Sequence, residues 1–155
     1  MFPNLHQKVK DALEQDPDGA VVSPVPSFDG SANFDNHQEV YYTHVMGNFR
    51  CSSNKCKREG SKKVSIEIVR FKKNKYNASV FGQRCEKCNE LGMLKLHEKS
   101  YVDRVVYRLK RWAGIKPKKP MRRRPLWDKP PHQRQLCEGC KIGRCKESED
   151  YEEID

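Results

Sequence analysis

Seven cysteines, placed mostly in close pairs, constrain this chain more than any other feature of its sequence. Two pairs have C-x2-C spacing, "CEKC" and "CEGC", and a third, "CSSNKC", has C-x4-C spacing. These spacings are typical of zinc ligands, because two thiolates on one tight turn can point at the same ion. One histidine, in "PPHQRQLCEGCKIGRC", precedes the last cluster. The candidate ligands are therefore eight, enough for two four-ligand sites: Cys51, Cys56, Cys85, Cys88, His132, Cys137, Cys140 and Cys145.

Disulfides and redox pairs are the alternatives to metal. An odd number of cysteines fits poorly with complete internal pairing. The N-terminal stretch "MFPNLHQKVKDALEQD" lacks the basic and then apolar order of a secretion signal. We therefore expect a cytoplasmic or nuclear protein, where disulfides are rare. The sequence predicts two structural Zn²⁺ ions, with an iron–sulfur cluster as the less favoured alternative.

The sequence leaves open how the eight ligands divide between two ions. The first four cysteines could share one ion and the last four ligands the other, or the first and last pairs could meet at one site. In either arrangement four protein ligands leave no open position for a reacting water, so we expect no enzyme. Only 35% of the 155 residues are hydrophobic. We expect metal binding to supply folding free energy that a small core lacks.

Charge is distributed unevenly along the chain. Residues 1–40 carry a net charge of −5 and residues 147–155 a net charge of −6, whereas residues 41–146 hold 29 basic and eight acidic residues, a net charge of +21. This predicts an acidic N-terminal extension with a short helix and a Pro/Gly/Ser linker (1–40), a zinc-binding domain (41–146) and an acidic tail (147–155). No run of about 18 apolar residues exists, so we expect no membrane span.

Periodicity predicts the secondary structure. Apolar residues at helical spacing predict a short helix over 4–14, and alternation predicts half-buried strands over 64–71 and 76–84, joined by a turn at 72–75. A second amphipathic helix is expected from Ser100, a capping residue, to a stop at Gly114. The predicted fold is a small α+β domain, stapled by zinc, with a β-hairpin, one amphipathic helix and zinc knuckles.

The positive charge of the central region favours a polyanionic partner, and we predict RNA. Candidate phosphate contacts lie on the turn, the second helix and a Pro-broken basic segment: Lys72, Lys73, Lys75, Arg104, Arg108, Arg111, Arg122, Arg123 and Arg124. Aromatic residues lie among them, and any that are exposed could stack on bases, although most should pack in the core: Phe71, Tyr76, Phe81, Tyr107, Trp112 and Trp127. The alternative function is a protein-interaction adaptor or chaperone-like module. The remaining histidines are treated as ordinary residues: His6, His37, His44 and His97.

Four segments, taken together, resemble the 3CxxC-type zinc-finger family, especially its fungal members. They are "HVMGNFRCSSNKCKREGSKKVSIEI", "YNASVFGQRCEKC", "SYVDRVVYRLKRWAG" and "PPHQRQLCEGCKIGRC", in the family's order across residues 41–146. The domain also occurs in receptor-transporting and zygote arrest proteins. The resemblance implies a zinc-binding domain that uses the cysteine pairs and the last His/Cys segment, and RNA binding as in zygote arrest proteins. The Trp that members carry shortly after the first pair is missing, and a receptor-trafficking role is not implied.

Overall fold

A computed structural model of the chain describes residues 3–16, 25–26, 37–117 and 131–148. Its helices and strands are, in chain order, α1 (Pro3–Glu14), β1 (Val25–Pro26), β2 (His37–Cys51), β3 (Glu59–Phe71), β4 (Lys75–Val80), β5 (Gly92–Leu96), α2 (Glu98–Trp112), the 3-10 helix η3 (Arg134–Leu136) and α3 (Glu138–Lys141). Helices and strands alternate irregularly and most strand pairs are antiparallel, which confirms the α+β class.

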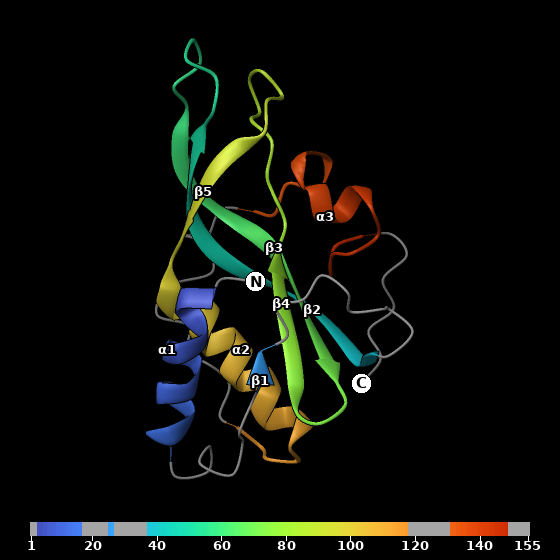
Figure 1. Ribbon diagram of the computed structural model, residues 1–155. Coiled ribbons are helices and arrows are strands. Elements are labelled where there is room, and N and C mark those ends of the chain that lie inside the picture. The colour runs from blue at the N-terminus through green and yellow to red at the C-terminus, as the bar shows by residue number, and fades with distance from the viewer. Residues whose placement is uncertain (1–2, 17–24, 27–36, 118–130, 149–155) are drawn as a thin grey trace.

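One sheet with the strand order β1-β4-β3-β2-β5 organises the described part of the molecule. The β2–β3, β3–β4 and β2–β5 pairs are antiparallel, and the two-residue β1 pairs in parallel with β4. The long strands β2 and β3 run along the molecule and curl (Figure 1). Two loops project beyond their upper ends in this view, one between β2 and β3 and the other between β4 and β5.

The predicted hairpin is confirmed as β3 and β4. Lys73 and Asn74 at its turn have φ angles of 58° and 57°, and the N–H of Lys75 donates to the carbonyl of Lys72 at 3.4 Å. Two central residues with positive φ match the right-handed twist of the flanking strands. Strand β4 ends at Val80 instead of reaching residue 84, because the chain leaves β3 there and pairs elsewhere.

The prediction of a half-buried β3 is wrong in one respect, because both of its faces are covered. Val64, Ile66 and Ile68 face the helices and join the main core. Ser65 and Glu67, expected to face solvent, are 0% and 3% exposed. These two residues are covered by the C-terminal segment, residues 131–148, whose Arg144 contacts both. Because that segment is far away in the sequence, the periodicity of β3 alone could not show that its second face is buried.

Helix α2 packs on the sheet through Tyr101, Val105 and Leu109. It begins earlier than predicted, at Glu98, and the side chain of Ser100 does not cap it. The Ser100 hydroxyl accepts the N–H of Met46 at 3.1 Å instead, which ties the helix to β2.

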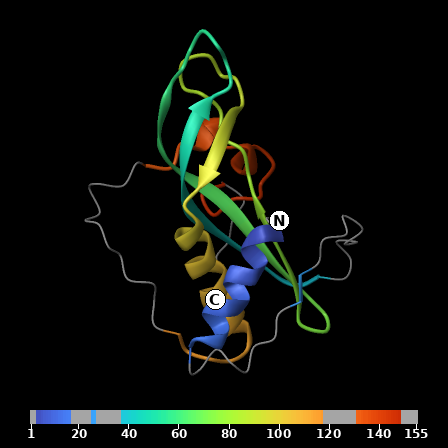
Figure 2. The same cartoon turned by 60° about the vertical axis from the view of Figure 1, so that its left-hand side comes forward.

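Helix α1 lies along α2 on the same face of the sheet (Figures 1 and 2). Its apolar stripe, Leu5, Val9 and Leu13, is fully buried in the main core. Asp16, just beyond the helix, forms an ion pair with the buried Lys110 of α2. The helix predicted for the acidic extension is thus part of the packed body. Within the described ranges, no helix is both long enough and apolar enough to cross a membrane.

Candidate metal centres

Four cysteines from the two projecting loops form the first centre. Cys51 ends β2, Cys56 lies in the β2–β3 loop, and Cys85 and Cys88 lie in the β4–β5 loop. Their Sγ atoms all lie within 4.8 Å of one another, with Cys51 and Cys88 3.4 Å apart and Cys56 and Cys85 3.6 Å apart. Tetrahedral zinc with Zn–S bonds of about 2.3 Å separates its sulfurs by about 3.8 Å. The four thiols therefore fit one zinc ion.

The backbone of these loops is shaped for thiolates. Lys57 and Asn89, which each follow the second cysteine of a pair, have φ angles of 47° and 57°. Each left-handed residue turns the chain back directly after the second cysteine of its pair, Cys56 or Cys88. The N–H of Ser53 donates to the Sγ of Cys51 at 3.4 Å. Such N–H groups disperse charge on a metal-bound sulfur and orient it.

The second centre is formed within the C-terminal segment. The Nε2 atom of His132 lies 3.3 Å from the Sγ of Cys140 and 3.5 Å from the Sγ of Cys145, and Cys137 completes a group whose donor atoms all lie within 4.8 Å. The Nδ1 atom of His132 lies 3.0 Å from the Lys63 carbonyl and donates to it, which leaves Nε2 as the free donor atom for a metal. Three thiolates and one imidazole with an outer hydrogen bond are a donor set typical of structural zinc.

Tight packing holds the second centre in place. The Sγ of Cys137 accepts the N–H of Cys140 at 3.4 Å, where the short helix α3 begins. Gly143 takes a positive φ of 70° just before the last cysteine. A Cβ on Gly139 would lie 2.9 Å from a ring carbon of Phe81, so the turn lies directly against that ring. The two groups of donor atoms show how the ligands divide: the first four cysteines form one centre, and His132 with the last three cysteines forms the other. This is the first of the two arrangements that the sequence left open.

Each centre contains one thiol whose pKa is lowered, Cys85 or Cys145, and two thiols whose pKa is raised. Burial raises the pKa of Cys51 and of Cys140 to about 12. Burial also opposes ionisation of Cys85, but hydrogen bonds from the N–H groups of Cys88 and Lys87 outweigh it and lower its pKa to about 6. Since zinc binds thiolates, loading each centre must release protons from the thiols whose pKa is raised, and zinc affinity therefore falls in acid.

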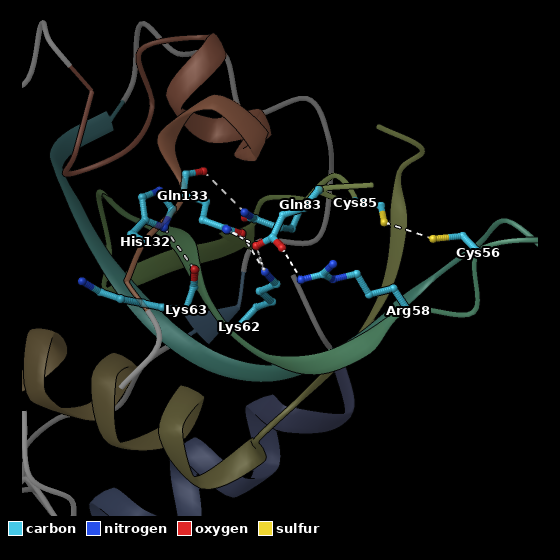
Figure 3. A network of polar contacts seen from close by, with 9 residues as sticks. Cys56, Arg58, Lys62, Lys63, Gln83, Cys85, His132 and Gln133 are labelled. Carbon is cyan, nitrogen blue, oxygen red and sulfur yellow. Dashed lines mark hydrogen bonds and ion pairs between the residues drawn. The ribbon is translucent and has the colours of Figure 1, made fainter. Parts of the chain in front are cut away.

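A polar network connects the two centres (Figure 3). Glu86 lies between the two cysteines of "CEKC", and Gln133 follows the histidine of the second centre. The Nζ of Lys62 donates to Glu86 at 2.8 Å and to Gln133 at 2.6 Å, and the amide of Gln133 also donates to Glu86. Arg58 pairs with the same carboxylate. Hydrogen bonds from Lys62 and Gln133 lower the pKa of Glu86 to about 2.

Backbone pairing reinforces this connection. Gln83 forms an antiparallel β-bridge with Cys137, and the N–H of Arg84 donates to the carbonyl of Leu136 at 2.8 Å. The loop that supplies half of the first centre is therefore hydrogen-bonded to the segment that forms the second. The two centres share one framework and are not two separate fingers.

Comparison with family models finds one match. The model of the 3CxxC zinc ribbon, described as a zinc-binding domain, matches residues 44–143. The chain belongs to this family. Searches of curated proteins and of solved structures find no match. The matched part of this zinc ribbon contains every candidate ligand except Cys145, which follows it by two residues, and the two centres fit two zinc ions.

The predicted phosphate contacts lie apart from the centres. Lys72, Lys73 and Lys75 are exposed at the β3–β4 turn, and Arg111 is exposed near the end of α2. Arg104 and Arg108 are half-buried, and the guanidinium of Arg108 lies 3.2 Å from the ring centroid of Tyr41. Three predicted contacts lie outside the described residues: Arg122, Arg123 and Arg124.

Few of the aromatic residues are free to stack on bases. Tyr76 is 1% exposed and its hydroxyl bonds His6 at 2.8 Å. Four others are half-buried: Phe71, Phe81, Tyr107 and Trp112. Trp127 lies outside the described residues.

Sequence reasoning missed one residue at the second centre, His44. No sequence pattern marks it as more than an ordinary histidine, but the structure places it in β2 beside Cys145. No spacing rule connects these two residues, because they are 101 positions apart. Only the fold of the C-terminal segment onto β2 and β3 brings them together.

Proposed function

We propose that this zinc ribbon is a nucleic-acid-binding module, with RNA as its partner, in which both zinc ions are structural. The net charge of +21 over residues 41–146 supports the proposal. A chain with so much positive charge gains affinity for phosphate backbones through release of counterions. The closed ligand sets leave the metal a role in stability, because four protein donors at each centre complete the coordination of zinc.

The placement of unpaired cations is the observation that carries the proposal. Five exposed cations lie at the β3–β4 turn, in the last turn of α2 and just beyond it, and they form what we call the basic end: Lys72, Lys73, Lys75, Arg111 and Lys116. Figures 1 and 2 both place this turn and the end of α2 at the end of the molecule opposite the first centre. Arg70, which pairs with Glu39, connects β3 to the end of α2, since its Nη1 also donates to the carbonyl of Trp112 at 3.3 Å.

None of the five has an acidic partner among the described residues. Several cations near the metal centres are instead paired with acids: Arg58 and Lys62 with Glu86, Arg84 and Lys141 with Glu138, and Arg144 with Glu67. Unpaired cations can contact phosphate without first breaking an ion pair. The basic end therefore offers five such cations to a polyanion, and the exposed lysines Lys55, Lys87 and Lys95 near the first centre provide the comparison.

The test measures binding of the zinc-loaded protein to a labelled single-stranded RNA by fluorescence anisotropy over a range of salt concentrations. The triple variant Lys72→Gln/Lys73→Gln/Lys75→Gln should reduce the slope of log K against log salt by about 2, since each phosphate contact on a single strand contributes about 0.7. A matched control, Lys55→Gln/Lys87→Gln/Lys95→Gln, removes the same charge from exposed lysines near the first centre. Equal losses in both variants would show that total charge, and not the basic end, governs binding.

Duplex RNA and DNA of the same sequence distinguish the partner. Tighter binding of single-stranded RNA than of either duplex supports the proposal. An absence of binding to every nucleic acid at low salt would overturn it.

A protein-interaction role is the second candidate, and the edge strand β5 favours it. Leu91, just before this strand, and Met93, within it, are 46% and 59% exposed. An exposed strand edge beside apolar side chains can accept an extended peptide. Met93→Lys should abolish binding of such a partner and leave RNA affinity unchanged or slightly higher, which separates the two roles.

A further inference from the structure

A second imidazole lies beside the second metal centre. His44, in the middle of β2, is 8% exposed, and its Nε2 atom lies 3.7 Å from the Sγ of Cys145. Its ring centroid lies 4.5 Å from that of His132. His44 does not belong to the group of four donor atoms that lie within 4.8 Å of one another. His44 therefore contacts Cys145, a candidate ligand, but is not itself one of the four candidate ligands of the second centre.

The position of His44 suits a hydrogen-bond donor to sulfur. A zinc ion with three thiolates and one neutral imidazole carries a net charge of −1, and this centre is largely enclosed: Cys137 and Cys145 are both 0% exposed. Buried negative charge is costly unless hydrogen-bond donors compensate it. Cys137 receives the N–H of Cys140, and the imidazole of His44 can serve Cys145 in the same way, beside the hydroxyl of Ser65.

We propose that His44 is a positioning residue of the second centre, whose Nε2–H donates to the Sγ of Cys145 and keeps this sulfur in place as a thiolate ligand. His44 binds no metal in this arrangement. It lowers the electron density on Cys145 and so protects the centre from electrophiles, because an uncompensated thiolate is the more reactive nucleophile. The inference concerns metal retention and does not depend on what the basic end binds.

Two substitutions of equal length separate hydrogen bonding from packing. His44→Gln keeps an N–H donor near the sulfur, whereas His44→Met has a similar shape and no donor. Loss of an outer hydrogen bond to a metal ligand weakens zinc affinity by about 10- to 100-fold. We expect that loss at the second centre in His44→Met, and a much smaller loss in His44→Gln.

The measurement is the rate at which each cysteine of the zinc-loaded protein reacts with iodoacetamide, resolved by peptide mass spectrometry. The reaction rates of Cys51, Cys56, Cys85 and Cys88 then measure metal retention at the first centre, and those of Cys137, Cys140 and Cys145 measure it at the second. His44→Met should react about 10-fold faster or more at the second centre, with the first centre at the wild-type rate. His97→Met is the control, since this exposed histidine bonds Asn48 away from both centres and should change neither rate.

Three outcomes would overturn the proposal. Equal acceleration, or equal failure to fold, in the Gln and Met variants would assign His44 a packing role only. A His44→Met protein that reacts at the wild-type rate would show that Cys145 does not need the donor that His44 supplies. Faster reaction at the first centre instead of the second would place the effect of His44 elsewhere.

Discussion

At the scale of single residues, Glu86 contributes to the first centre without binding metal. Its carboxylate accepts hydrogen bonds from Lys62 and Gln133 and pairs with Arg58. It therefore fixes the turn that carries Cys85 and joins that turn to the segment of the second centre. Side chains of this kind orient ligands from outside the coordination shell.

We predict that Glu86→Gln lowers the free energy of unfolding at pH 7, because it removes the ion pairs with Lys62 and Arg58. The loss should be only about 1 kcal/mol, since these partly exposed ion pairs are screened by solvent. The pKa of Glu86 is about 2 in the folded protein, below the usual 4.5. Its stabilisation is therefore complete above about pH 4.5 and is lost as the pH falls toward 2. Thermal unfolding at pH 5 and pH 7 should show the same difference from wild type.

Glu90→Gln is the matched control for this prediction, since Glu90 is an exposed carboxylate of the same loop. It should leave the melting temperature near that of the wild type. A Glu86→Gln protein as stable as wild type would contradict the account of the polar network.

At the scale of elements, α1 stabilises the zinc ribbon although the family match begins only at residue 44. Leu13 is 1% exposed in the core formed with α2 and the sheet. Leu13→Ala should cost about 2–5 kcal/mol, the usual loss for a large apolar side chain in a packed core. Chemical denaturation measures this loss, while native mass spectrometry should still find two zinc ions in the folded fraction.

Glu14→Gln, an exposed change in the same helix, should leave stability unchanged within about 0.5 kcal/mol. A Leu13→Ala protein with the stability of wild type would show that α1 is not anchored through its apolar stripe.

Local patterns predicted the hairpin strands and the two long helices, whereas β5, the short C-terminal helices and the long-range pairing were beyond them. The hairpin and both long helices follow from periods of two and 3.6 residues, and the ligands follow from short spacings, which are local properties. The buried face of β3, with Ser65 and Glu67, depends on a segment far along the chain. So does His44, whose contact with Cys145 spans most of the domain. No periodicity or spacing encodes such contacts.

At the scale of the whole molecule, the metal centres and the apolar core occupy different regions. The main core lies between the sheet and the helices α1 and α2, whereas both centres join loops and the C-terminal segment beyond it. Only a small second cluster, Phe49, Cys51 and Cys85, supports the first centre with buried apolar contacts. Apart from this cluster, the described loops are held by metal and by the hydrogen bonds around Glu86 and Gln83.

Removal of zinc should therefore abolish the cooperative unfolding transition of the whole chain. Structural zinc sites contribute about 10–16 kcal/mol to folding in small zinc domains, which is as large as the stability of an ordinary domain. Circular dichroism of the reduced protein, with a strong zinc chelator, should show loss of β structure and of the thermal transition. Added Zn²⁺ should restore both, and Mg²⁺ should not.

Cys140→Ser tests the same point without a chelator. Serine supplies no thiolate, so the variant should lose zinc from the second centre and unfold, whereas Ser53→Ala, which keeps its backbone N–H, should load two ions. A metal-free chain with an unchanged cooperative transition would refute the structural role of zinc.

The β-bridge between Gln83 and Cys137 also limits how the gene can be divided. A fragment that stops before residue 131 would retain all four cysteines of the first centre but would lose the strand partner of the loop that carries two of them. A fragment that holds only the C-terminal segment, residues 131–148, would lose the face of the sheet against which the second centre packs. Neither half is an independent module that recombination could transplant, so the two zinc sites must be inherited together.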